Sequence, residues 1–142
     1  MLCGCGGSGL SVDSFDVRDP HACRALVDAL PARVAELPEQ TVSGSSYAAA
    51  WGSEDPIVLR CGVPMPEDFS QTSDCHMADG IGWFATPSGA AEDQSLDVTM
   101  TTVHRSPVVS VDVPASRRPP VAAMVDLAGV IKKHTRSTGQ CR

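Results

Sequence analysis

The stretch Ile57–Cys61 begins with an uninterrupted apolar run, Ile57 to Leu59, and is bounded by glycine and proline on both sides. This pattern predicts a short buried strand around which the chain is organised. Side chains alternate across a strand, so Ile57, Leu59 and Cys61 share the core-facing side and Arg60 lies on the other. Arg60 is either a cross-strand charge partner or a ligand-binding group, and the ordinary composition of sheet faces favours the first.

A first helix is predicted from Pro20 to near Leu30, because apolar residues recur there at four-residue spacing. Asp19 is the expected N-cap, and Pro20 occupies the first helical position, where a missing N–H costs nothing. Pro31 interrupts the pattern. The helix therefore ends near Leu30, or kinks there and adds one more turn over residues 32–37.

The second half of the chain predicts further strands and a last helix. Asp79-Gly80 is a two-residue hairpin signal, and the alternating stretches 96–103 and 108–113 indicate two strands joined by a tight turn. Pro119-Pro120 opens a helix that runs to about Lys133. Its predicted core-facing side carries Val121, Met124, Val125, Ala128 and Ile131.

These elements predict an α+β fold with a four- or five-stranded, mainly antiparallel sheet and both helices packed on one face. Residues 1–18 are expected to be a flexible N-terminal segment, and residues 19–142 a single α+β domain. A chain of 142 residues is long enough for one ordinary core. No stretch approaches the roughly 20 apolar residues that a bilayer-spanning helix needs.

Charge is distributed unevenly along the chain. Residues 1–116 contain five Lys or Arg and sixteen Asp or Glu, whereas residues 117–142 contain six and one. Nucleic-acid binding needs a basic face that neutralises phosphates, so the acidic body argues against it. The basic C-terminal segment is either a partner-docking surface or, as the pattern favours, a solvated chain end.

The cysteine count is the most informative part of the composition: Cys3, Cys5, Cys23, Cys61, Cys75 and Cys141. No pair has the spacing of a zinc ribbon or a thioredoxin-like site, so no metal centre and no cofactor is predicted. Scattered single cysteines are typical of disulfides and an oxidising compartment. Four cysteines allow three pairings. We expect Cys61–Cys75, which would join neighbouring strands, and Cys23–Cys141, which would join the ends of two antiparallel helices.

The first residues resemble part of a bacterial lipobox. Leu2 stands three positions before Cys5, with a small residue just before the cysteine, so Cys5 is the lipidation candidate. The basic and apolar regions of a signal peptide are missing from this sequence. Either the true start lies upstream of Met1, which would explain an exported body, or the resemblance is chance. A metal-binding Cys3/Cys5 pair is the third option.

The thirteen residues between Cys61 and Cys75 predict a long loop, with no helical or strand periodicity. Long loops are either functional or structural, and here Met65 and Phe69 are the candidates for an apolar binding contact. Catalytic chemistry has weaker support. Cys75, His76 and Asp79 provide a nucleophile, a base and an orienting group in name, but adjacent strand residues point to opposite faces. No catalytic residue is therefore assigned.

Several motifs together resemble the small actinobacterial domain-of-unknown-function family thirty-five-fifteen. The resemblance covers nearly the whole body and rests on the segments Asp19–Pro31, Ala50–Gly52, Ile57–Val63, Cys75, Gly80–Trp83, Ser106–Pro114 and Cys141. It implies a secreted or lipid-anchored envelope protein without an assigned activity. The chain departs from the family pattern at its N-terminus, where the export signal is absent.

The function expected from the sequence is that of a non-catalytic binding or interaction module. Its expected location is extracytoplasmic, either in the cell envelope or secreted. The partner is an unknown envelope protein or ligand, with membrane contact only through a lipid at Cys5, and the chain is expected to be a monomer. The alternative is a hydrolase or transferase that uses Cys75 and His76 or a site without a recognisable motif.

Overall fold

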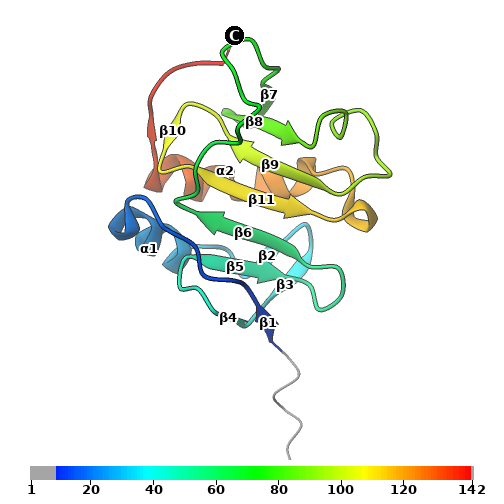
Figure 1. Cartoon of the computed structure of the whole chain (residues 1–142). Coiled ribbons are helices and arrows are strands. Elements are labelled where there is room, and N and C mark those ends of the chain that lie inside the picture. Colours follow the sequence, from blue (N-terminus) through cyan, green and yellow to red (C-terminus); the bar gives the residue numbers. More distant parts are fainter. Residues whose placement is uncertain (1–8, 142) are drawn as a thin grey trace, which may run out of the picture.

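The computed structural model describes residues 9–141 (Figure 1). Its main feature is one antiparallel sheet of eight strands, in the spatial order β2 (Arg33–Val34), β3 (Leu37–Gln40), β5 (Ala48–Trp51), β6 (Ile57–Cys61), β11 (Val109–Val113), β9 (Val98–Thr102), β8 (Ile81–Thr86) and β7 (His76–Ala78). The mixed helix–strand class and the antiparallel sheet are confirmed. The number of strands exceeds the predicted four or five, because strands of two to four residues are too short to show an alternating pattern.

Two further strand pairs and two α-helices complete the described chain. β1 (Leu10–Ser11) pairs in parallel with β4 (Val42–Ser43), and β10 (Arg105–Ser106) pairs with β12 (Arg136–Ser137). The helices are α1 (Pro20–Asp28) and α2 (Val121–His134), and a short 3₁₀ helix spans Ala115–Arg117. Neither α-helix has the length and apolarity that crossing a bilayer would require.

Both α-helices lie behind the sheet in the view of Figure 1 and contact each other. Their buried side chains, including Leu26 of α1 and Leu127 of α2, join one core with Ile57, Leu59 and Val111 from the strands. Trp51 and Trp83 are fully buried in the same core. The predicted core-facing side of β6 is therefore confirmed.

The start of α1 follows the prediction, but the segment after it does not. The Ala22 N–H donates to the Asp19 carboxylate at 3.3 Å, which is the expected cap. No extra helical turn follows Pro31. Instead β2 and β3 form a hairpin, whose turn residues Ala35 and Glu36 have φ of 50° and 66°. Neither is glycine or asparagine, so the turn carried no recognisable sequence signal.

The predicted inward side of α2 is partly wrong. Met124, Ala128 and Ile131 are buried as expected, but Val121 and Val125 are 51% and 46% exposed. Ala123 and Leu127 are buried instead, with Ala123 at 1% exposure. The buried face of α2 is therefore rotated about the helix axis, by about one residue, from the face that the sequence predicted.

Residues 10–12 and the long loop of residues 62–75 cover parts of the sheet face opposite the helices. Val12 is buried against Ala50 and Val58, and Leu10 packs beside them. The packed part of the chain thus includes residues N-terminal to residue 19. Figure 1 shows residues 62–75, in green, running from the end of β6 to β7. Phe69 anchors this long loop through an edge-on contact with Phe84, with ring centroids 5.2 Å apart.

All four body cysteines form disulfides, but the predicted pairing is wrong. Cys23 is bonded to Cys61 and Cys75 to Cys141, with Cα–Cα separations of 5.5 and 5.8 Å. β6 and β7 are not neighbours, because β11, β9 and β8 lie between them. The chain after α2 does not return to α1 either. It pairs with β10 and reaches β8, where Gly82 leaves room for the Cys75–Cys141 bridge. Cys3 and Cys5 lie outside the described residues.

Candidate functional site

The edge of the sheet is incomplete beside β8. β8 spans Ile81–Thr86, but β7 pairs only with its first three residues, and the last pair is His76 with Trp83. The chain before His76 belongs to the long loop and does not continue along β8. The second half of β8, Phe84–Thr86, therefore has no strand neighbour on this side among the described residues.

The backbone N–H and C=O groups of successive β8 residues point to opposite sides of the strand, and this decides which of them face the gap. The Val103 N–H donates to the Gly82 carbonyl at 2.9 Å, so the backbone groups of Gly82 point toward β9. The direction of the N–H and C=O groups alternates from one residue to the next along an antiparallel strand. The backbone groups of Phe84 therefore also point toward β9, and those of Ala85 point away from it. No other residue of the range 9–141 hydrogen-bonds to Ala85 on the open side. Ala85 thus presents one free N–H and one free C=O.

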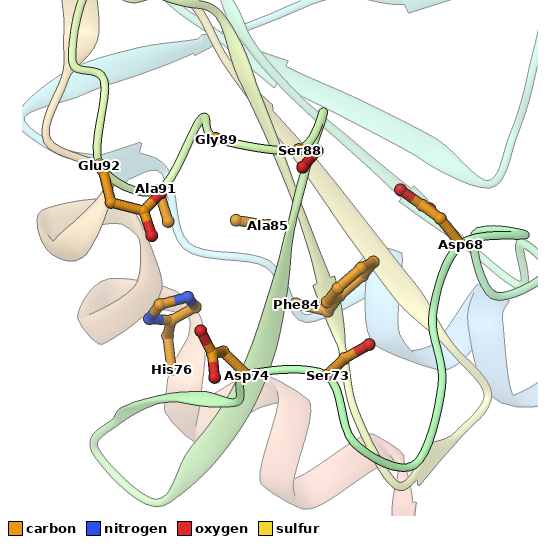
Figure 2. Close-up of a pocket in the computed structure, with 10 residues that line it drawn as sticks. All are labelled: Asp68, Ser73, Asp74, His76, Phe84, Ala85, Ser88, Gly89, Ala91 and Glu92. Atoms are coloured by element: carbon orange, nitrogen blue, oxygen red, sulfur yellow. The ribbon is translucent and has the colours of Figure 1, made fainter.

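A cleft of about 410 Å³ lies at this gap. Figure 2 shows its walls on either side of β8. Asp68, Ser73 and Phe84 lie on one side, and His76 and Glu92 on the other. The complete lining also includes Asp74, Ala85, Ser88, Gly89 and Ala91. The cleft thus combines an aromatic ring and free backbone groups with several polar side chains, and it is more polar than the mainly apolar pockets that hold most small molecules.

The electrostatic character of the cleft is negative. Asp68, Asp74 and Glu92 are exposed, and none of them is in an ion pair among the described residues. Among the residues that the structure describes, His76, which is half-buried, is the only basic side chain in the lining. Like charges that converge on a concave surface reinforce each other, so this cleft attracts cations and repels anions.

The comparison with protein families identifies a family for this chain. A family model described as "Protein of unknown function (DUF3515)" matches residues 8–139. The chain belongs to this family. The match includes every residue that lines the cleft. No curated protein and no solved structure matches the chain.

The DUF3515 chain does not assemble the Cys75, His76 and Asp79 constellation. The Cys75 sulfur is bonded to Cys141, so it is not a free thiolate. The Asp79 carboxylate lies 3.9 Å from the Lys132 ammonium, at the hairpin turn. His76 lines the cleft without either of them. Among residues 9–141, no three His, Cys, Asp or Glu side chains are grouped closely enough to hold a metal ion.

The three predicted binding candidates lie in different surroundings. Phe69 packs on Phe84, so it supports the aromatic side of the cleft. Met65 is half-buried in the same loop and does not line the cleft. Arg60 donates to the Asp112 carboxylate at 2.6 Å across the sheet. The cross-strand interpretation of Arg60 is therefore confirmed.

Sequence reasoning missed the carboxylates and the free strand edge of the cleft. Asp68 and Asp74 belong to the long loop, and Glu92 belongs to a turn-rich connection, where charged residues are common. Their convergence depends on the order of β7, β8 and β9. Only the length of the loop, together with its apolar residues Met65 and Phe69, pointed to this region.

Proposed function

We propose that this DUF3515 chain is an extracytoplasmic, non-catalytic binding module whose ligand occupies the cleft at the β8 edge and carries positive charge. The observation that carries the proposal is that three carboxylates without an ion pair among residues 9–141, those of Asp68, Asp74 and Glu92, line the same cleft as the Phe84 ring. An aromatic face attracts a cation within about 6 Å of its centre, in addition to the attraction of the carboxylates.

Two disulfides support the extracytoplasmic location. Cys23 and Cys61 are both fully buried, and such bridges persist in oxidising compartments but are rare in the cytosol. A lipid anchor at Cys5 belongs to the same proposal. The test is to express the chain with its genomic upstream sequence and to fractionate the cells. Cys5→Ser should lose membrane association, whereas Cys3→Ser should retain it; retention by both variants would contradict the anchor.

The binding interpretation is preferred to hydrolase or transferase chemistry for a structural reason. Nucleophilic catalysis by cysteine needs a thiolate, and the Cys75 sulfur is engaged in a disulfide. Of the hydroxyls in the cleft, Ser73 hydrogen-bonds to the neighbouring Ser70 and not to His76. The groups of the cleft therefore suit recognition, which needs only charge and shape.

The proposal is tested with a small cationic probe. N-acetylarginine methylamide should shift the backbone amide signals of Asp74, Ala85 and Glu92 in NMR spectra, and N-acetylglutamine methylamide should not. Asp68→Asn, Asp74→Asn and Glu92→Gln together should weaken binding of the cationic probe about tenfold, since exposed ion pairs contribute up to roughly 1 kcal/mol each.

A matched control removes the same charge elsewhere. Asp13→Asn, Asp16→Asn and Glu54→Gln change three exposed carboxylates outside the cleft lining and should leave affinity nearly unchanged. Binding of the cationic probe should also weaken as ionic strength rises. Equal affinity of both triple variants for the probe would show that the cleft is not the cation site.

A further inference from the structure

We infer that the ligand of the cleft is a short extended segment of another protein, with a basic–apolar–basic sequence, which adds to the free edge of β8. This inference rests on the proposed function and specifies its ligand. It starts from the backbone of Ala85, whose N–H and C=O both face the cleft.

An extended peptide is the ligand class that satisfies both groups at once. One residue of a strand that runs antiparallel to β8 donates its N–H to the Ala85 carbonyl and accepts from the Ala85 N–H. Every neighbouring pair in the eight-stranded sheet is antiparallel, so we place the peptide in the same orientation. The peptide continues the course of β7 along the second half of β8, beyond the pair of His76 with Trp83. A polyamine supplies charge but has no acceptor for the Ala85 N–H.

The side-chain preferences follow from alternation across the strand. The peptide residue opposite Ala85 projects to the same face as the Ala85 side chain. On that face a hollow of about 220 Å³ adjoins the cleft and is lined in part by Ala85, Ala91, Met100 and Met124. The alanine and methionine side chains favour an apolar side chain of about the size of valine, and Arg118 in the same lining already donates to the Ala90 and Leu96 carbonyls. Methionine side chains adapt to the shape of such a guest.

The two flanking peptide residues project to the opposite face, where Phe84 and Asp68 lie (Figure 2). A lysine or arginine there lies over the Phe84 ring and near the carboxylate. Arginine suits this site better than lysine, because its planar guanidinium stacks on rings and pairs with carboxylates at two points. Asp68 favours a basic residue on this face directly, and Asp74 and Glu92, which lie across β8, add a longer-range attraction for positive charge on either side of the apolar residue.

The open edge also limits the length of the peptide. Pro87 follows Thr86 directly and has no N–H, so pairing cannot extend beyond the end of β8. At the other end of the open edge, His76 of β7 already pairs with Trp83, so the peptide cannot extend in that direction. About three residues of a partner are accommodated, which is a small interface of the kind found in transient complexes.

The experiment uses acetyl-Arg-Val-Arg-amide with the folded, disulfide-bonded chain. Binding should protect the Ala85 N–H from hydrogen exchange at least fivefold, and the peptide should bind more tightly than N-acetylarginine methylamide. N-methylation of the valine removes the N–H that donates to Ala85 and should weaken binding at least tenfold without changing the charge. N-methylation of the last arginine is the matched control, because that N–H points away from β8.

The outcomes separate this inference from the proposed function. Equal binding of both N-methylated peptides, together with loss of binding in the triple carboxylate variant, would overturn strand addition and leave the cationic cleft intact. Failure of the peptide and of the arginine probe alike would overturn both. Concentration-dependent protection of Ala85 without peptide, with dimers in analytical ultracentrifugation, would identify a second copy as the occupant and overturn the inference.

Discussion

Arg60 and Asp112 form an ion pair across the centre of the sheet, on the face opposite the helices. The Arg60 guanidinium donates to one carboxylate oxygen of Asp112 at 2.6 Å, and the Thr99 hydroxyl donates to the other at 2.8 Å. The three residues come from the adjacent strands β6, β11 and β9. Asp112 therefore links three strands, and both of its oxygens are satisfied by partners within the sheet.

This arrangement predicts measurable coupling between Arg60 and Asp112. A double-mutant cycle with Arg60→Ala and Asp112→Ala should give a coupling free energy of about 0.5–1 kcal/mol, because the two side chains are 31% and 39% exposed and partly screened. Asp112→Ala alone should cost more than Arg60→Ala, since Thr99 also loses its acceptor. The control is the more exposed pair Arg24–Asp28 at 3.5 Å, where we expect about 0.3 kcal/mol. Equal coupling for both pairs in urea unfolding would contradict this account.

The two disulfides should differ in their accessibility to reductants. Cys23 and Cys61 are fully buried, whereas Cys75 and Cys141 are half-buried beside two surface hollows. Thiol–disulfide exchange requires the attacking thiolate to reach a sulfur atom. Mild dithiothreitol under native conditions should therefore release Cys75 and Cys141 first, as measured by alkylation and peptide mass. Earlier release of Cys23 would disprove the burial argument.

Loss of the buried bridge should reduce stability markedly. Cys23–Cys61 closes a loop with a sequence separation of 38, for which the chain-entropy model gives about 4 kcal/mol. The double substitution Cys23→Ser and Cys61→Ser should lower the free energy of unfolding by about this amount, and the melting temperature should fall with it. An unchanged melting temperature would show that this bridge is absent from the folded protein.

Gly82 is predicted to be essential for the second disulfide. A Cβ at this position would collide with the Cys141 sulfur and lie 2.7 Å from that of Cys75. Gly82→Ala should therefore leave free thiols or destabilise the fold, as measured by thiol titration and thermal unfolding. Gly129→Ala is the matched control, because nothing lies within 4 Å of its Cβ and alanine favours the helix by up to about 1 kcal/mol. A fully oxidised, equally stable Gly82→Ala protein would contradict the close approach.

Asp93 should titrate below its ordinary pKa of about 3.9. The Ser95 hydroxyl donates to its carboxylate at 2.6 Å and the Ser95 N–H at 3.0 Å, and both bonds favour the charged form and lower the pKa. The stabilisation is thus present above the unfolded pKa and is lost as pH falls through the lower folded pKa. NMR titration should show the Asp93 pKa rising toward its ordinary value in Ser95→Ala, and no change in the control Ser53→Ala.

Local elements were predictable where the deciding interactions are short in range. The Asp19 cap, the Asp79-Gly80 turn and the apolar face of β6 each depend on neighbouring residues, and the structure contains all three. The β2–β3 hairpin was missed because Ala35 and Glu36 adopt positive φ without a glycine or asparagine signal. The exposure of Val121 was missed because the orientation of a helix depends on the elements that it packs against.

The sequence by itself determined the class of fold, the family, the helices near each end, the central strand and the participation of four cysteines in disulfides. Tertiary structure alone decided which cysteines pair, because the strand order inserts β11, β9 and β8 between the strand of Cys61 and that of Cys75. It likewise decided the cleft, whose carboxylates and free Ala85 backbone meet only where β7 stops short of the end of β8. Strand order is set by contacts between residues distant in sequence, and a pattern read over a few neighbouring residues does not contain that information.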